Sequence, residues 1–97
     1  MGKHFEPGDT FSEGTLKTDD IGFALIDALD SMNKRRAATL RRKFVAALDS
    51  DDLEAADEII YESLYPALED YAPDGCYIGS IEGDGACIGC WQIEEAF

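Results

Sequence analysis

The spacing of apolar residues changes once along this chain, and that change constrains the fold most. From Thr18 to Tyr71, apolar side chains recur every three or four residues, as in an α-helix buried on one face. Ala72-Pro-Asp-Gly75 then stops the helical pattern, because proline and glycine favour a turn. Two short runs follow around Gly83-Asp84-Gly85, which is typical of a β-hairpin. The sequence therefore predicts an α+β fold of about three helices followed by a C-terminal hairpin.

The helical part predicts three helices, over residues 18–32, 34–48 and 52–71. Thr18 is expected to cap the first, since its hydroxyl can accept a hydrogen bond from the first turn. Asp51 with Glu54 three residues later matches the capping-box spacing at the start of the third. Pro66 lies inside the third helix, and we expect it to kink the helix or start a new turn because it lacks a backbone donor.

The hairpin part predicts strands at residues 76–82 and 86–93 joined by a three-residue loop, with Gly85 in the left-handed position. A two-stranded ribbon alone is marginal in water, so it must pack on the helices or gain a third strand from the N-terminal arm. That arm, residues 1–15, reads as irregular with a short extended piece at 10–12. The predicted pairs on one face are Ile81–Cys87, Gly79–Gly89 and Tyr77–Trp91.

The chain of 97 residues fits a single domain over 1–97. No run approaches the roughly 18 apolar residues that a membrane span needs. The first ten residues lack the hydrophobic stretch of a secretory signal, so we expect a cytoplasmic protein that does not contact membranes.

Charge is distributed unevenly along the chain. Residues 1–43 hold all 8 Lys and Arg against 7 acids, whereas residues 44–97 hold 14 acids and no Lys or Arg. The overall charge of −13 would repel phosphate, which makes direct nucleic-acid binding unfavourable. A basic protein surface is the natural partner for such a field, and the alternative is that acidity only keeps the chain soluble.

The hairpin residues Tyr77-Ile-Gly79, Gly83-Asp84-Gly85-Ala86 and Gly89-Cys90-Trp91 resemble the C-terminal end of a group of small bacteriophage and prophage proteins. Residues 64–73 are similar to the helix before that hairpin, and residues 14–20 to the start of the first helix. The resemblance covers about half the chain. It departs from the group at Cys87 and Cys90, where an acid and an aromatic are usual, and in the basic stretch 34–43. It implies a phage context and a fold but no mechanism, because the group has no assigned activity.

The cysteines raise the question of a metal site. Cys87 and Cys90 have CxxC spacing and, with Cys76 and His4, would form a three-Cys, one-His zinc set. The hairpin pairing places Cys87 and Cys90 on opposite faces, however, and no second CxxC exists. We therefore expect small buried thiols, no metal and no cofactor. His4 has no nucleophile pattern beside it, so no enzyme is predicted.

Two further features allow two interpretations each. Gly79 opposite Gly89, flanked by Tyr77 and Trp91, is either a place where a helix packs closely or an aromatic-edged groove for a partner. The helix over 34–48 gathers its bases on one face, which predicts pairing with acids of the same molecule, or contacts in a homodimer, rather than nucleic-acid binding. That basic face comprises Lys34, Arg35, Arg41 and Arg42, with Arg36 and Lys43 beside them.

Two functional hypotheses follow. The first is a non-enzymatic inhibitor, similar to an anti-CRISPR protein, whose acidic surface mimics nucleic acid and occupies a basic channel on a host protein. The second is a small phage structural, assembly or accessory protein whose acidity only gives solubility. The partner-binding residues predicted for the first are Glu54, Asp57, Glu58, Glu62, Glu69, Asp70, Asp74, Tyr77, Glu82, Asp84 and Trp91.

Overall fold

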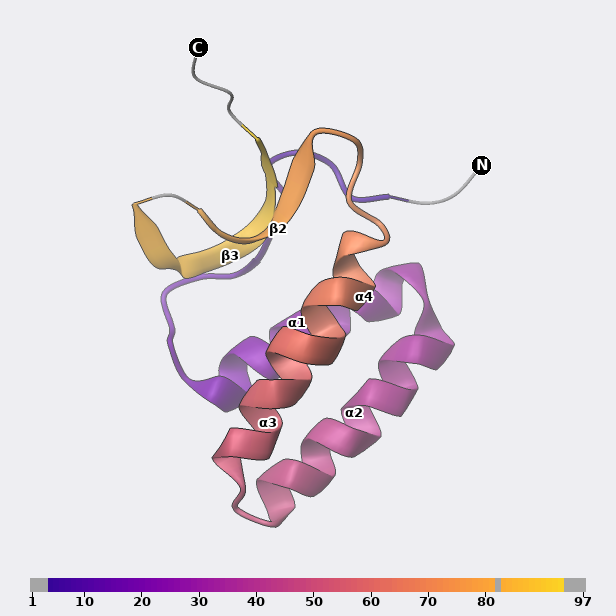
Figure 1. The fold of residues 1–97 in the computed structure, drawn as a ribbon, viewed down its shortest axis with the longest axis vertical. Helices are drawn as coiled ribbons and strands as arrows, with labels where there is room; N and C mark the ends of the chain where they lie inside the picture. The colour runs from indigo at the N-terminus through magenta and orange to yellow at the C-terminus, as the bar shows by residue number, and fades with distance from the viewer. Residues whose placement is uncertain (1–3, 82, 94–97) are drawn as a thin grey trace.

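The computed structural model describes residues 4–81 and 83–93, and it places three helical rods beneath a three-stranded antiparallel sheet (Figure 1). The α+β class predicted from the sequence is confirmed. In chain order the elements are β1 (Thr10–Ser12), α1 (Thr18–Met32), α2 (Lys34–Asp49), α3 (Leu53–Ile59), the π-helical segment η1 (Ile60–Leu64), α4 (Tyr65–Glu69), β2 (Cys76–Ile81) and β3 (Asp84–Gln92).

The first two helices have nearly the predicted bounds, with α2 one residue longer. Asn33 separates them: its N–H donates to the Leu29 carbonyl at 2.7 Å, and its side-chain oxygen accepts from the Arg36 N–H at 3.1 Å. Thr18 is not the cap that the sequence predicts, because Lys17 holds that position. The Thr18 hydroxyl instead donates to the Asp57 carboxylate at 2.8 Å, which ties the start of α1 to α3.

The turn between α2 and α3 shifts the predicted cap by one residue. Asp52, not Asp51, caps α3 by accepting from the Ala55 N–H at 3.1 Å. Asp51 adopts φ 57°, and the N–H groups of Asp51 and Asp52 donate to the carbonyls of Leu48 and Ala47. This is the Schellman ending of a helix, in which glycine usually holds the left-handed position.

The third rod joins α3, η1 and α4 end to end and covers residues 53–69 instead of the predicted 52–71. The wide π turn comes just before Pro66, and the N–H of Tyr65 donates to the Ile60 carbonyl five residues earlier. Pro66 lies in the first turn of α4, directly after the π turn. The expected new turn at Pro66 is therefore confirmed, and a π turn makes room for it.

The sheet has the order β1-β3-β2, so the third strand from the N-terminal arm is confirmed. Phe5 of the arm is buried, its N–H donates to the Tyr71 carbonyl at 2.8 Å, and its ring packs on Phe11. The arm therefore belongs to the core, although the sequence reads as irregular there. None of the helices in the described ranges is long and apolar enough to cross a membrane.

The hairpin register agrees with the prediction along most of its length. The pairs Gly79–Gly89 and Tyr77–Trp91 are confirmed. The predicted pair Ile81–Cys87 is wrong, because the register shifts after Ser80 and Ile81 then lies opposite Asp84.

The turn of the hairpin also differs from the prediction. The left-handed glycine is Gly83, with φ 90°, and Gly85 belongs to β3. Strand β3 covers residues 84–92 instead of 86–93, and β2 is described as far as Ile81 because Glu82 lies outside the described residues.

One cluster of buried side chains joins the helices, the sheet and the arm. Leu25, Ile26, Leu29, Phe44, Leu64 and Leu68 form its fully buried centre, and Ile78, Ile88 and Cys90 extend it to the sheet. The core therefore fixes the third rod by its inner side and leaves the outer side of that rod to solvent.

Candidate protein-binding surface

The outer side of the third rod carries a row of carboxylates. Ala56, Ile60, Leu64, Ala67 and Leu68 are its buried residues. Glu54, Glu58, Glu62 and Glu69 are exposed. In an α-helix a four-residue step rotates a side chain by about 40°. The π turn reduces that drift, so all four carboxylates stay on one side over about 22 Å of helix.

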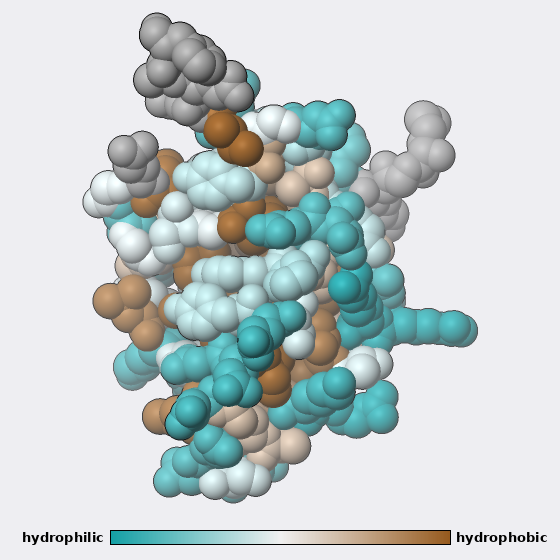
Figure 2. Space-filling view, viewed as in Figure 1, coloured by the Kyte–Doolittle hydropathy of each residue, from teal (hydrophilic) through white to brown (hydrophobic). Residues whose placement is uncertain are grey.

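Two tyrosines lie within this row. The rings of Tyr61 and Tyr65 meet edge to face, with centroids 5.3 Å apart, and Tyr61 is 61% exposed. Burial, and then the neighbouring Tyr61, raises the pKa of Tyr65 above its usual value. We call Glu54, Glu58, Tyr61, Glu62, Tyr65 and Glu69 the acidic face. Figure 2 shows hydrophilic side chains gathered over α3 and α2, with apolar surface visible between them.

Tyr61 and Tyr65 are not among the partner-binding residues predicted from the sequence. Their four-residue spacing, interleaved with Glu58 and Glu62, was the available signal. Only the placement of the buried stripe shows that the Tyr61 ring is exposed beside the carboxylates, while the Tyr65 ring is half-buried between it and the core.

The remaining predicted acids lie elsewhere or already have a partner. Asp57 is half-buried and accepts the Thr18 hydroxyl, and Asp70 pairs with Arg36 at 2.7 Å. Asp74 is exposed in the turn after α4. Asp84 is exposed at the start of β3, where its carboxylate accepts the Ala86 N–H.

The bases of α2 are only partly used within the molecule. The structure gives two ion pairs among the residues it describes, Arg36–Asp70 and Arg41–Asp27 at 3.2 Å. Arg41 thus pairs with α1, and Arg36 pairs with Asp70, which lies directly after α4 and within the predicted third helix (52–71). Lys34, Arg35, Arg42 and Lys43 are exposed and have no such partner in residues 4–81 and 83–93.

The glycine patch of the hairpin is covered by this chain's own residues. A Cβ on Gly89 would lie 3.0 Å from Thr10 Cα and from the Trp91 ring, and closer still to the Asp9 carbonyl. The Trp91 indole N–H donates to the Gly79 carbonyl at 2.8 Å. The element packed at Gly89 is therefore the N-terminal arm and not a helix, which was one of the two expectations for this patch. Trp91 and Tyr77 are half-buried against the sheet.

The cysteines do not converge on a metal geometry. Cys76 and Cys90 share a hydrogen bond, while Cys87 lies half-buried near the register shift and His4 is exposed in the arm. Burial raises the pKa of Cys90 to about 11, and Cys76 and Asp9 add to the shift. Across residues 4–81 and 83–93, no group of three or more His, Cys, Asp or Glu side chains could hold a metal ion.

No protein-family model, curated protein or solved structure matches this chain.

Proposed function

We propose that this chain is a non-enzymatic binding protein whose acidic face occupies a basic, nucleic-acid-contacting surface on another protein. The observation that carries the proposal is the outward row of Glu54, Glu58, Glu62 and Glu69 around a tyrosine pair in which Tyr61 is exposed and Tyr65 half-buried. None of these four carboxylates takes part in an ion pair within the described residues.

Charge spacing supports this choice of partner. Carboxylates four residues apart are separated by about 6 Å along a helix, while one DNA strand carries a charge every 3.4 Å of axis. The acidic face therefore presents a row of negative charges along a helix, at roughly half the number of charges per ångström of a DNA strand. Arginine and lysine side chains that contact phosphates can pair with it without rearrangement of this chain.

The tyrosines add what carboxylates alone lack. A guanidinium group can stack on an exposed aromatic ring while it pairs with a neighbouring carboxylate. Tyrosine is also enriched among the residues that contribute most to protein–protein binding. The tyrosine pair thus provides aromatic surface beside Glu58, Glu62 and Glu69 and favours a protein partner over a simple counter-ion.

The concrete form of the proposal is inhibition of a host nucleic-acid-handling or defence factor in the cytoplasm, as an anti-CRISPR protein acts. Its phage context rests on the resemblance of the hairpin segment. The competing proposal, an assembly or accessory protein with acidity for solubility, predicts that neutral substitutions on the acidic face leave function intact.

The test is affinity capture from a bacterial lysate with three versions of the chain: wild type, Glu58→Gln/Glu62→Gln and the matched control Glu6→Gln/Glu13→Gln. Both variants remove two exposed glutamates and the same net charge. We expect a nucleic-acid-binding protein to be captured by wild type and control, released by added DNA, and lost with the Glu58/Glu62 variant. Equal capture by all three versions would contradict the proposal.

A further inference from the structure

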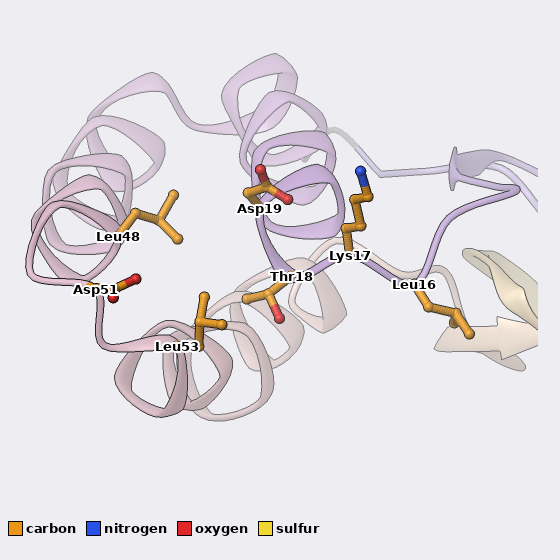
Figure 3. A pocket seen from close by; sticks show the side chains of 7 residues that line it. All are labelled: Leu16, Lys17, Thr18, Asp19, Leu48, Asp51 and Leu53. Carbon is orange, nitrogen blue, oxygen red and sulfur yellow. The ribbon is translucent and has the colours of Figure 1, made fainter.

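A pocket of about 530 Å³ opens where the start of α1 meets the turn between α2 and α3 (Figure 3). Its lining residues are Leu16, Lys17, Thr18, Asp19, Leu48, Asp51 and Leu53. Leu48 and Leu53 point into the space between the helices, and Leu16 lies at the other end of the pocket (Figure 3). None of these residues belongs to the acidic face.

The pocket exposes apolar side chains that the core does not use. Leu16 is 75% exposed and Leu53 is 55% exposed. Thr18, which also lines the pocket, donates a hydrogen bond to Asp57, and this bond fixes the start of α1 against α3. The pocket walls are therefore held in place, and burying a ligand's apolar side chain there would remove the two leucines from water.

The charges at the Leu48–Leu53 end favour a cation. Helix α2 has 16 residues and no base in its last turn, so the negative end of its dipole is not compensated there. Asp51 lies just beyond that end, and no hydrogen bond or ion pair among the described residues involves its carboxylate. Lys17, the base of the pocket, lies on the α1 side with its side chain directed away from Asp51 (Figure 3).

We propose that this pocket binds a short peptide segment in which an apolar side chain stands next to a cationic one. The apolar side chain enters between Leu48 and Leu53, and the cation pairs with Asp51 at the end of α2. The inference does not depend on the acidic face, because it rests on different residues and is tested with a different ligand.

The probe is N-acetyl-leucyl-arginine amide, titrated into the ¹⁵N-labelled full chain and followed by amide chemical shifts. We expect saturable shifts concentrated in residues 16–21 and 48–54, with a dissociation constant on the order of 1 mM. N-acetyl-leucyl-glutamine amide and N-acetyl-glycyl-arginine amide should each bind about threefold more weakly or worse, since each lacks one of the two groups.

Variants separate the pocket from general electrostatic attraction. Asp51→Asn removes the carboxylate but tolerates the left-handed backbone, and Leu53→Ser removes an exposed leucine, so both should fold. Each should weaken binding of the leucyl-arginine probe about threefold or more, while Glu58→Gln, with the same loss of charge as Asp51→Asn, should not change it. Shifts spread over the acidic face, equal binding of the glutamine probe, or no saturation would overturn the proposal.

Discussion

Replacing Gly22 by alanine should destabilise this chain, although alanine favours a helix. Gly22 lies in α1 against α2, and a Cβ on it would lie 2.5 Å from Cε1 and Cε2 of Phe44 and closer still to Cζ. Phe44 is fully buried, and Phe23 packs edge to face on its ring at 5.2 Å. The ring therefore cannot swing away without displacing other core side chains.

The magnitude follows from two opposing effects. Alanine in place of glycine stabilises a helix interior by about 0.8–1.0 kcal/mol. Forcing an extra carbon into a packed core costs about 1–3 kcal/mol. Because the added carbon overlaps three atoms of a fully buried ring, we take the upper half of that cost, about 2–3 kcal/mol. We therefore expect Gly22→Ala to lower the free energy of unfolding by about 1–2 kcal/mol, which corresponds to roughly 4–16 °C in Tm for a domain of this size.

Urea denaturation followed by far-UV circular dichroism measures this change. A smaller side chain at position 44 should relieve the clash, so Gly22→Ala with Phe44→Leu should lose about 1 kcal/mol less than the sum of the two single changes. If Gly22→Ala were as stable as wild type, or if the two changes were additive, the close approach of α1 and α2 at Gly22 would be wrong.

Three further predictions concern the turn, the thiol and the ion pairs. Asp51→Gly should raise the free energy of unfolding in urea by about 0.5 kcal/mol, because glycine adopts φ 57° without a steric cost; no gain would contradict the Schellman ending. With the pKa of Cys90 at about 11, above its value of 9.0 when exposed, the folded state keeps a proton that the unfolded state loses. The free energy of unfolding should thus fall by up to about 2 kcal/mol between pH 9 and 11. The fall over the same pH range should be smaller in Cys90→Ala, which lacks the thiol. Arg36→Ala and Arg41→Ala should each change stability by less than about 1 kcal/mol, because both pairs are exposed; a larger loss by thermal denaturation would show that they hold the helices together.

The elements of this fold follow from local signals in the sequence. Helical spacing predicts α1 and α2 within one residue, and the glycine-rich turn predicts the register of Gly79–Gly89 and Tyr77–Trp91. These features depend on neighbours along the chain or on a short turn, which a single sequence displays.

What the sequence does not predict depends on tertiary contacts or on choices between adjacent residues. Either Asp51 or Asp52 could cap α3 by its side chain. Asp52 does so because the Schellman hydrogen bonds at the end of α2 hold Asp51 in the left-handed conformation. Thr18 is used for a hydrogen bond to Asp57, 39 residues away, which no local pattern reveals. The register shift after Ser80 likewise depends on how the hairpin turn closes.

The sequence predicts that the third helix carries the candidate site, but it does not predict which residues of that helix form the site. The acids of the third helix were identified from charge alone, and the structure separates Glu54, Glu58, Glu62 and Glu69 from Asp57 and Asp70, which already have partners. The tyrosine pair could not be predicted, because the placement of the buried stripe decides which side of the rod Tyr61 and Tyr65 lie on. Glu82, also predicted to bind a partner, lies outside the described residues.

The most direct test of the acidic face is competition for the captured partner, with labelled DNA followed by fluorescence anisotropy. Wild type and the Glu6→Gln/Glu13→Gln control should displace the DNA at the same concentration. The Glu58→Gln/Glu62→Gln variant should need at least about tenfold more, which corresponds to 1.4 kcal/mol. Displacement should also weaken steeply as salt is raised. If the DNA stayed bound while this chain bound the same protein, the acidic face would not occupy a nucleic-acid-contacting surface.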